Sequence, residues 1–183
     1  MVKERAKIDL TKFCSRDHSN RTKPFSRGKW TYATDGRICI RVPRLTDIPE
    51  NKKAPNCEQI FKKADENSPY EWVAVPEMTV ETVICFDCKG SGKWRDIDDT
   101  NHPCEECDGE GKVQEIKAVK IPLGDLTIAL SNVYLDLIRK ELSNPQIGLI
   151  KEAEESHPSM PVKIRFDGGE GLLMPIKISG GVL

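Results

Sequence analysis

The sequence lacks the features that would place it in or across a membrane. It has no apolar run near the length of about 18 residues that a membrane helix needs. Its first ten residues, MVKERAKIDL, are charged and lack the apolar centre of a secretory signal. We therefore expect a cytoplasmic protein with no membrane association.

The common signatures of enzymes are missing as well. Gly90-x-Gly92 is followed by Lys93-Trp94 rather than by the Gly-Lys-Ser/Thr of a phosphate-binding loop. There is no G-x-S-x-G nucleophile motif, and with three histidines in the chain no His-based metal triad is evident. The paired carboxylates Asp98-Asp99 and Glu154-Glu155 are typical of solvated loops. We expect no catalytic residues, and an enzyme is the least favoured of three functional hypotheses.

What the chain does have is an uneven charge. Its 183 residues are 38% hydrophobic and 31% charged, which fits one globular domain or a domain with a small insert. The net charge is −1, but residues 1–63 hold 16 Lys and Arg against 7 Asp and Glu, whereas residues 64–183 hold 12 against 22. This pattern is typical of a nucleic-acid face on the first segment or of charges that interleave on one folded surface, and the sequence leaves both open.

The chain also has seven cysteines, and four of them follow one repeated pattern. An odd number without a secretory signal argues against a disulfide framework. The pattern C-x-x-C-x-G-x-G occurs at residues 85–92 and again at residues 104–111. Glycines allow the sharp turn that brings both thiolates of a pair to one metal ion. Two such pairs about fifteen residues apart indicate a tetrahedral zinc site rather than redox pairs. We expect one structural Zn²⁺, bound by Cys85, Cys88, Cys104 and Cys107.

The residues between the two cysteine pairs are acidic and poor in apolar side chains. Trp94 and Ile97 are the large apolar residues there, so the metal must supply most of the folding energy. His102 is an alternative ligand that a four-cysteine site does not need. Within residues 95–110 a single Arg95 stands against seven acidic residues, namely Asp96, Asp98, Asp99, Glu105, Glu106, Asp108 and Glu110. Such a surface repels phosphate backbones, so we expect it to contact a protein partner.

Over residues 85–111 this repeat resembles the cysteine-rich zinc region of DnaJ-type co-chaperones. That family carries four repeats and two zinc sites, so the two repeats here imply one site. His102-Pro103 is followed by Cys104, and the His-Pro-Asp of the family's J-domain is not found. The resemblance implies a zinc hairpin that contacts other polypeptides, without co-chaperone activity.

The second half of the chain has a clear periodicity. Alternating apolar residues predict a strand over 126–130, and helical spacing predicts a helix from Ser131 or Asn132 to Leu142. Further strands are predicted at 147–149, 162–166 and 172–178, with a polar loop over 152–161 and a hairpin turn at Gly168-Gly169. The second half is therefore expected to run strand, helix and three strands.

The first half is a fainter copy of the same order. We expect a strand at residues 8–10, a short helix over 11–17 and a β-hairpin at Asp35-Gly36. A helical turn or two is expected over 57–64. Extended segments at 72–75 and 80–84 then lead into the first cysteine pair.

Three segments resemble the bacterial sliding clamp, the β subunit of DNA polymerase III. Residues 31–38, TYATDGRI, look like the "ATDGHRL" hairpin of that family, with Arg37 in place of its histidine. Residues 132–138, NVYLDLI, resemble the start of a clamp helix, and residues 161–176 resemble its closing hairpin. The resemblance implies an α+β fold: a single DNA-clamp-like domain of two strand–helix–three-strand units. Residues 1–84 and 112–183 would form this domain, with the zinc hairpin of residues 85–111 inserted. The family's subunit has three such domains, so one domain does not imply a closed ring.

The sequence therefore predicts a non-enzymatic, zinc-binding adaptor with a clamp-like fold. It would be encoded by a phage or another mobile element, and linked to DNA metabolism through protein–protein contacts at the zinc hairpin. The alternative is a nucleic-acid-binding protein that uses a basic face from residues 1–63. Its phosphate contacts would include Arg37, Arg41, Arg139 and Lys140. The sequence shows no interleaving of aromatic and basic residues of the kind that binds single strands.

Overall fold

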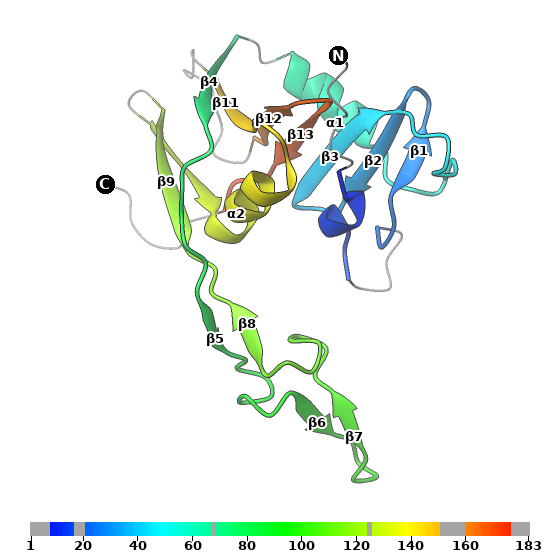
Figure 1. Cartoon of the computed structure of the whole chain (residues 1–183), viewed down its shortest axis with the longest axis vertical. Helices are drawn as coiled ribbons and strands as arrows, with labels where there is room; N and C mark the ends of the chain where they lie inside the picture. Colours follow the sequence, from blue (N-terminus) through cyan, green and yellow to red (C-terminus); the bar gives the residue numbers. More distant parts are fainter. Residues whose placement is uncertain (1–7, 17–20, 67–68, 124–125, 151–159, 177–183) are drawn as a thin grey trace, which may run out of the picture.

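The structure, a computed structural model, describes residues 8–16, 21–66, 69–123, 126–150 and 160–176 (Figure 1). This part of the chain is mostly β. Its helices are the 3₁₀ helix η1 (Leu10–Phe13), α1 (Cys57–Asp65) and α2 (Asn132–Glu141). The strands are β1 (Phe25–Arg27), β2 (Trp30–Thr34), β3 (Ile38–Pro43), β4 (Tyr70–Ala74), β5 (Thr82–Ile84), β6 (Lys93–Arg95), β7 (Asn101–Pro103), β8 (Lys112–Gln114), β9 (Ala118–Leu123), β10 (Leu126–Ser131), β11 (Gln146–Ile150), β12 (Val162–Phe166) and β13 (Gly169–Leu173).

A large antiparallel sheet forms the body of the molecule. Its seven strands lie in the order β1-β2-β3-β13-β12-β11-β4. Strand β13 pairs with β3, so the sheet joins strands from the beginning and the end of the chain. Strands of the first half and of the second half thus share this sheet, and both halves contribute residues to the hydrophobic clusters on its two faces.

The helices α1 and α2 lie on opposite faces of this sheet. On one face, α2 and η1 pack on the same core, to which α2 contributes Leu135 and Ile138 and η1 contributes Leu10 and Phe13. On the other face, α1 packs its Phe61 in a second cluster with residues of β1, β2, β3 and β13.

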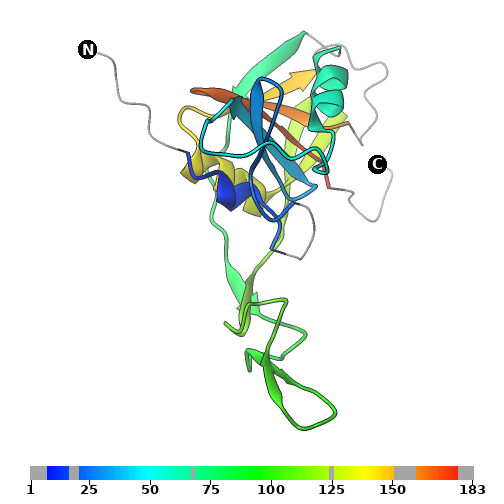
Figure 2. The same ribbon diagram turned by 90° about the vertical axis from the view of Figure 1, so that its right-hand side faces the viewer.

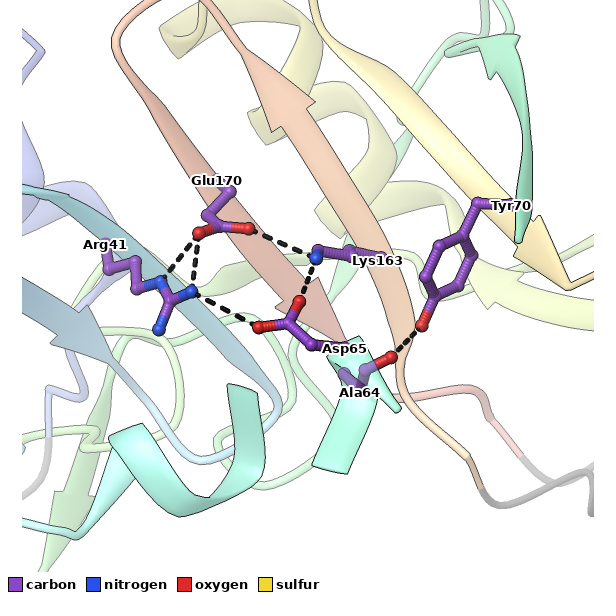
Figure 3. Close-up of polar contacts among 6 residues, drawn as sticks. All are labelled: Arg41, Ala64, Asp65, Tyr70, Lys163 and Glu170. Atoms are coloured by element: carbon purple, nitrogen blue, oxygen red, sulfur yellow. Dashed lines mark hydrogen bonds and ion pairs between the residues drawn. The ribbon is translucent and has the colours of Figure 1, made fainter. Parts of the chain in front are cut away.

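Ion pairs fasten the end of α1 to the sheet, as Figure 3 shows. The carboxylate of Asp65 pairs with Lys163 of β12 and lies 3.8 Å from the Arg41 guanidinium of β3. Arg41 and Lys163 also pair with Glu170 of β13, at 2.5 and 3.3 Å. Tyr70 of β4 donates a hydrogen bond to the carbonyl of Ala64. Helix α1 therefore ends at the middle of this face of the sheet.

Several predicted elements are confirmed. Helix α2 begins directly after Ser131, and the hairpin at Asp35-Gly36 joins β2 to β3. The Asp35 carboxylate closes this turn by accepting hydrogen bonds from the backbone N–H groups of Arg37 and Ile38, at 2.8 and 2.9 Å. Strands β11, β12 and β13 follow the helix as expected, but β13 spans Gly169–Leu173 instead of the predicted 172–178.

Other expectations are corrected. The strand predicted at residues 8–10 is wrong, because the Asp9 side chain accepts hydrogen bonds from the backbone N–H and hydroxyl of Thr11 and so starts η1. Strand β10 pairs with β9 in a separate two-stranded sheet, although it precedes α2 as expected. The end of the helix predicted over 11–17, most of the loop predicted over 152–161, and Ile178 lie outside the described residues.

Residues 85–111, here called the cysteine hairpin, project from one end of the body (Figures 1 and 2). Strands β5 and β8 pair to form its stalk, and β6 and β7 pair near its tip. None of the helices that the structure describes has the length and apolar content of a membrane span.

Candidate metal centre

The four cysteines predicted as ligands come together in the cysteine hairpin. Their Sγ atoms all lie within 4.8 Å of one another. The Sγ atoms of Cys85 and Cys104 are 3.9 Å apart, and those of Cys88 and Cys107 are 3.7 Å apart. All four side chains are buried. Four sulfurs that each lie about 2.3 Å from a tetrahedral zinc ion are about 3.8 Å from one another, so these thiols could hold a metal ion such as zinc.

The two cysteine pairs are held by matching backbone turns. The Cys85 N–H donates to the Gly111 carbonyl and the Cys104 N–H to the Gly92 carbonyl, each at 2.9 Å. Gly92 and Gly111 have positive φ angles of 69° and 74°. A Cβ at Gly92 would lie 2.1 Å from the Gly109 oxygen, and one at Gly111 would lie 2.4 Å from the Gly90 oxygen. The last glycine of each repeat is therefore required because the two turns pack backbone against backbone.

Backbone N–H groups also favour the ionised form of the thiols. The Gly92 N–H lies 3.3 Å from the Cys88 Sγ, and the Gly111 N–H lies 3.1 Å from the Cys107 Sγ. Burial opposes ionisation, yet the hydrogen bonds from the Gly92 and Gly90 N–H groups and from the thiols of Cys107 and Cys85 together outweigh it and lower the pKa of Cys88 to about 6. The pKa values of Cys85 and Cys104 are raised, with burial as a main cause, so in the absence of metal the ionised form is favoured at Cys88. The thiolate is the form that binds metal, so the turns prepare the site for a cation.

The four cysteines are not joined to one another, and the alternative ligand is used elsewhere. The separations of 3.7 and 3.9 Å between sulfurs of different pairs are far from the disulfide bond length of about 2.05 Å. All described cysteines are free thiols. His102, the alternative ligand, stacks on Trp94 with ring centroids 4.8 Å apart and bonds through Nε2 to Asp96 at 2.6 Å. This hydrogen bond helps to lower the pKa of Asp96, so His102 organises the tip of the hairpin instead of joining the thiols.

The surface of the cysteine hairpin is apolar as well as acidic. Of the eight large apolar side chains that are exposed in the described chain, three lie on the cysteine hairpin, namely Phe86, Trp94 and Ile97, and three more, Val83, Ile84 and Ile116, lie in the segments that join it to the body. Phe86 is 89% exposed and Ile97 is fully exposed. The sequence did not show this, because an apolar residue within a folded segment is ordinarily assigned to a core. The projection therefore exposes apolar side chains together with its carboxylates.

The hairpin meets the body near the end of η1. Arg16 pairs with Asp108 at 2.5 Å. A cavity of about 660 Å³ lies between the two parts, and its lining includes Arg37 and Tyr134 of the body and Glu106 and Glu110 of the hairpin. Basic groups of the first segment therefore face acidic groups of the hairpin, which favours the interpretation that the two charge excesses interleave on one surface.

The four basic residues predicted to contact phosphate do not form one surface site. Arg41 is buried, with its guanidinium paired to Glu170 and placed 3.9 Å from the Phe61 ring centroid. It is therefore a structural residue and not the exposed contact that was expected. On α2, Arg139 pairs with Glu77 and Lys140 with Asp136, at 3.0 and 2.6 Å. Arg37 is exposed in the β2–β3 turn, on the cavity described above.

Comparisons with known proteins give no relative. No family model, no curated protein and no solved structure matches the chain.

Proposed function

We propose that the four cysteines bind one structural Zn²⁺ ion and that the protein is a non-enzymatic adaptor. The observation that carries this proposal is a set of four buried thiols at zinc-like separations, inside a hairpin that displays its apolar side chains. Four protein ligands leave a tetrahedral ion no open position for water or substrate. The metal would then act as a support for the surface around it.

The partner would be a protein with a basic, apolar surface. Phe86 and Ile97 offer apolar groups for insertion into a partner's pocket, and the surrounding carboxylates favour positive charge at the rim. A hairpin fixed by metal loses little conformational freedom when it binds, which favours affinity.

The clamp-like body is part of the same proposal, and so are the link to DNA metabolism and the phage or mobile-element origin. Two features support it. Strand β10, α2 and strands β11 to β13 follow one another in the order of a clamp unit, and η1 packs beside α2 on the same core. The Tyr134 hydroxyl donates a 2.5 Å hydrogen bond to Asp35, so two of the clamp-like sequence segments contact each other.

A capture experiment from the native host tests the adaptor function. The immobilised, zinc-loaded protein should retain a specific partner, and Phe86→Ser should abolish this retention. Ile60→Ser is the matched control, because Ile60 is an exposed apolar residue of α1 on the body. Retention that survives both Phe86→Ser and removal of the metal would contradict the proposal.

A further inference from the structure

Half of the α1-bearing face of the large sheet displays aromatic and basic side chains together. In the strand register, Trp72 of β4 lies opposite Gly148 of β11, and Gly148 lies opposite Lys163 of β12. The neighbouring row places Gln146 between Ala74 and Arg165. We call this region the aromatic–basic face, formed by Tyr70, Trp72, Gln146, Gly148, Lys163 and Arg165. Among the described residues, α1 packs mainly over β1, β2, β3 and β13, and its last residues, Ala64 and Asp65, reach the edge of this region at Tyr70 and Lys163.

The side chains of this face form a stack. The Arg165 guanidinium carbon lies 4.3 Å from the centroid of the Trp72 ring, and the Tyr70 and Trp72 centroids are 5.7 Å apart. Gly148 makes room for the indole, because a Cβ there would lie 3.0 Å from Cζ3 of Trp72. The indole of Trp72 therefore lies against the backbone at Gly148, and the guanidinium of Arg165 lies against the indole.

The charge of Arg165 is not neutralised by any residue that the structure describes. Its Nε donates to the Gln146 Oε1 at 2.6 Å, which fixes the plane of the guanidinium. By contrast, Lys163 is paired with Asp65 and Glu170 (Figure 3). Arg165 is exposed and lines a cavity of about 510 Å³, whose lining also includes Asn144, Gln146 and Asp167. The Asp167 carboxylate accepts a hydrogen bond from the Asn144 amide at 2.6 Å. A planar cation, two amides and one carboxylate therefore surround one hollow beside the stack.

We propose that the aromatic–basic face binds single-stranded nucleic acid. One base would stack on the Arg165–Trp72 pair and reach into the cavity, where the amides can bond its edge, and the Arg165 terminal nitrogens would contact a phosphate. Unpaired bases stack on aromatic rings and on guanidinium planes in this way, whereas a duplex hides the faces of its bases. The sequence did not reveal this platform because its aromatic residues and its basic residues are about ninety positions apart, and β11 brings them together. The proposal does not depend on the metal or on the cysteine hairpin.

The test is a titration of the full-length, zinc-loaded protein with a fluorescent single-stranded oligonucleotide at low salt, followed by anisotropy. A ring that stacks on one base contributes about 1–3 kcal/mol, so Trp72→Ala should weaken binding by roughly 5- to 150-fold. Trp72→Phe should retain most of the affinity, because the stacking surface remains. Arg165→Gln, at an exposed position, should weaken binding without affecting the fold. Trp94→Ala is the matched control, because Trp94 is an exposed tryptophan on the cysteine hairpin, and it should bind as the native chain does.

Each other outcome overturns the proposal. These outcomes are absence of single-strand binding at low salt, equal binding by Trp72→Ala and Arg165→Gln, or duplex binding as tight as single-strand binding. If peptides but not oligonucleotides protect Trp72 from fluorescence quenching, the face would bind a polypeptide instead. Circular dichroism of each variant separates loss of binding from loss of fold.

Discussion

Replacing Cys107 by serine should unfold the cysteine hairpin and leave the body folded. The buried side chains within residues 85–111 are those of the four cysteines, and Val113 packs beside them. No apolar core of another kind holds this segment in the described chain. Loss of one thiolate should therefore remove most of the roughly 10–16 kcal/mol that a structural zinc ion supplies in small domains.

The effect on the body should be small, and its size follows from the contacts between the two parts. The ion pair that joins them, Arg16–Asp108, has side chains 86% and 53% exposed. An exposed pair of this kind contributes between zero and about 1 kcal/mol. The seven-stranded sheet and its core lie entirely outside the hairpin. We therefore expect the free energy of unfolding of the body to fall by less than about 1 kcal/mol.

Hydrogen exchange measured by peptide, together with denaturant unfolding, distinguishes the two parts. In the Cys107→Ser variant, amides of residues 85–111 should exchange like those of an unfolded chain, while those of β3, β12 and β13 keep their protection. Cys14→Ser is the control, because it removes a thiol outside the cluster. Loss of protection throughout the sheet, or a hairpin that stays protected without metal, would refute the reasoning.

Three further predictions concern other parts of the structure. Gly92→Ala should greatly weaken metal binding, because the added Cβ would collide with the Gly109 carbonyl. Gly28→Ala is the control, because Gly28 also has a positive φ but an added Cβ there would have no atom within 4 Å, so metal binding should be unchanged. Metal competition titrations measure the affinity of both variants. Arg41→Met should reduce the free energy of unfolding by about 3 kcal/mol in denaturant titrations, because it leaves Glu170 less compensated in a largely buried network. Burial raises the pKa of Tyr32, Tyr70 and Tyr134, so the folded state favours the neutral phenols. This stabilisation is fully present below the ordinary tyrosine pKa of about 10 and is lost as the pH rises beyond it. The absorbance of the tyrosinate band should therefore rise together with alkaline unfolding and not before it.

The sequence was most informative where structure depends on neighbouring residues. Each cysteine pair and its glycines lie within eight residues, and their turn depends on φ angles that the glycines allow, so the pattern alone predicted the thiol cluster. The hairpin at Asp35-Gly36 is equally local, because the Asp35 side chain bonds the next backbone N–H groups. In the same way, η1 depends on one short-range bond of Asp9, but apolar alternation at Ile8 and Leu10 suggested a strand instead.

Features that depend on distant partners were not predictable. The charge of Arg41 is neutralised by Glu170, which lies 129 residues away, so nothing near Arg41 in the sequence indicated a buried role. The exposure of Phe86 follows from the thin cross-section of the hairpin, which buries only its thiols. The contact of Trp72 with Arg165 requires three strands in register, and only the assembled sheet shows it.

The most direct test of the central claim, that the four hairpin cysteines bind one zinc ion, is the metal content of the purified protein, measured by elemental analysis together with the number of thiols that react in the folded state. We predict one zinc per chain, with the four hairpin thiols protected until a chelator removes the ion. A metal-free protein in which Cys85, Cys88, Cys104 and Cys107 react freely or form disulfides would contradict it.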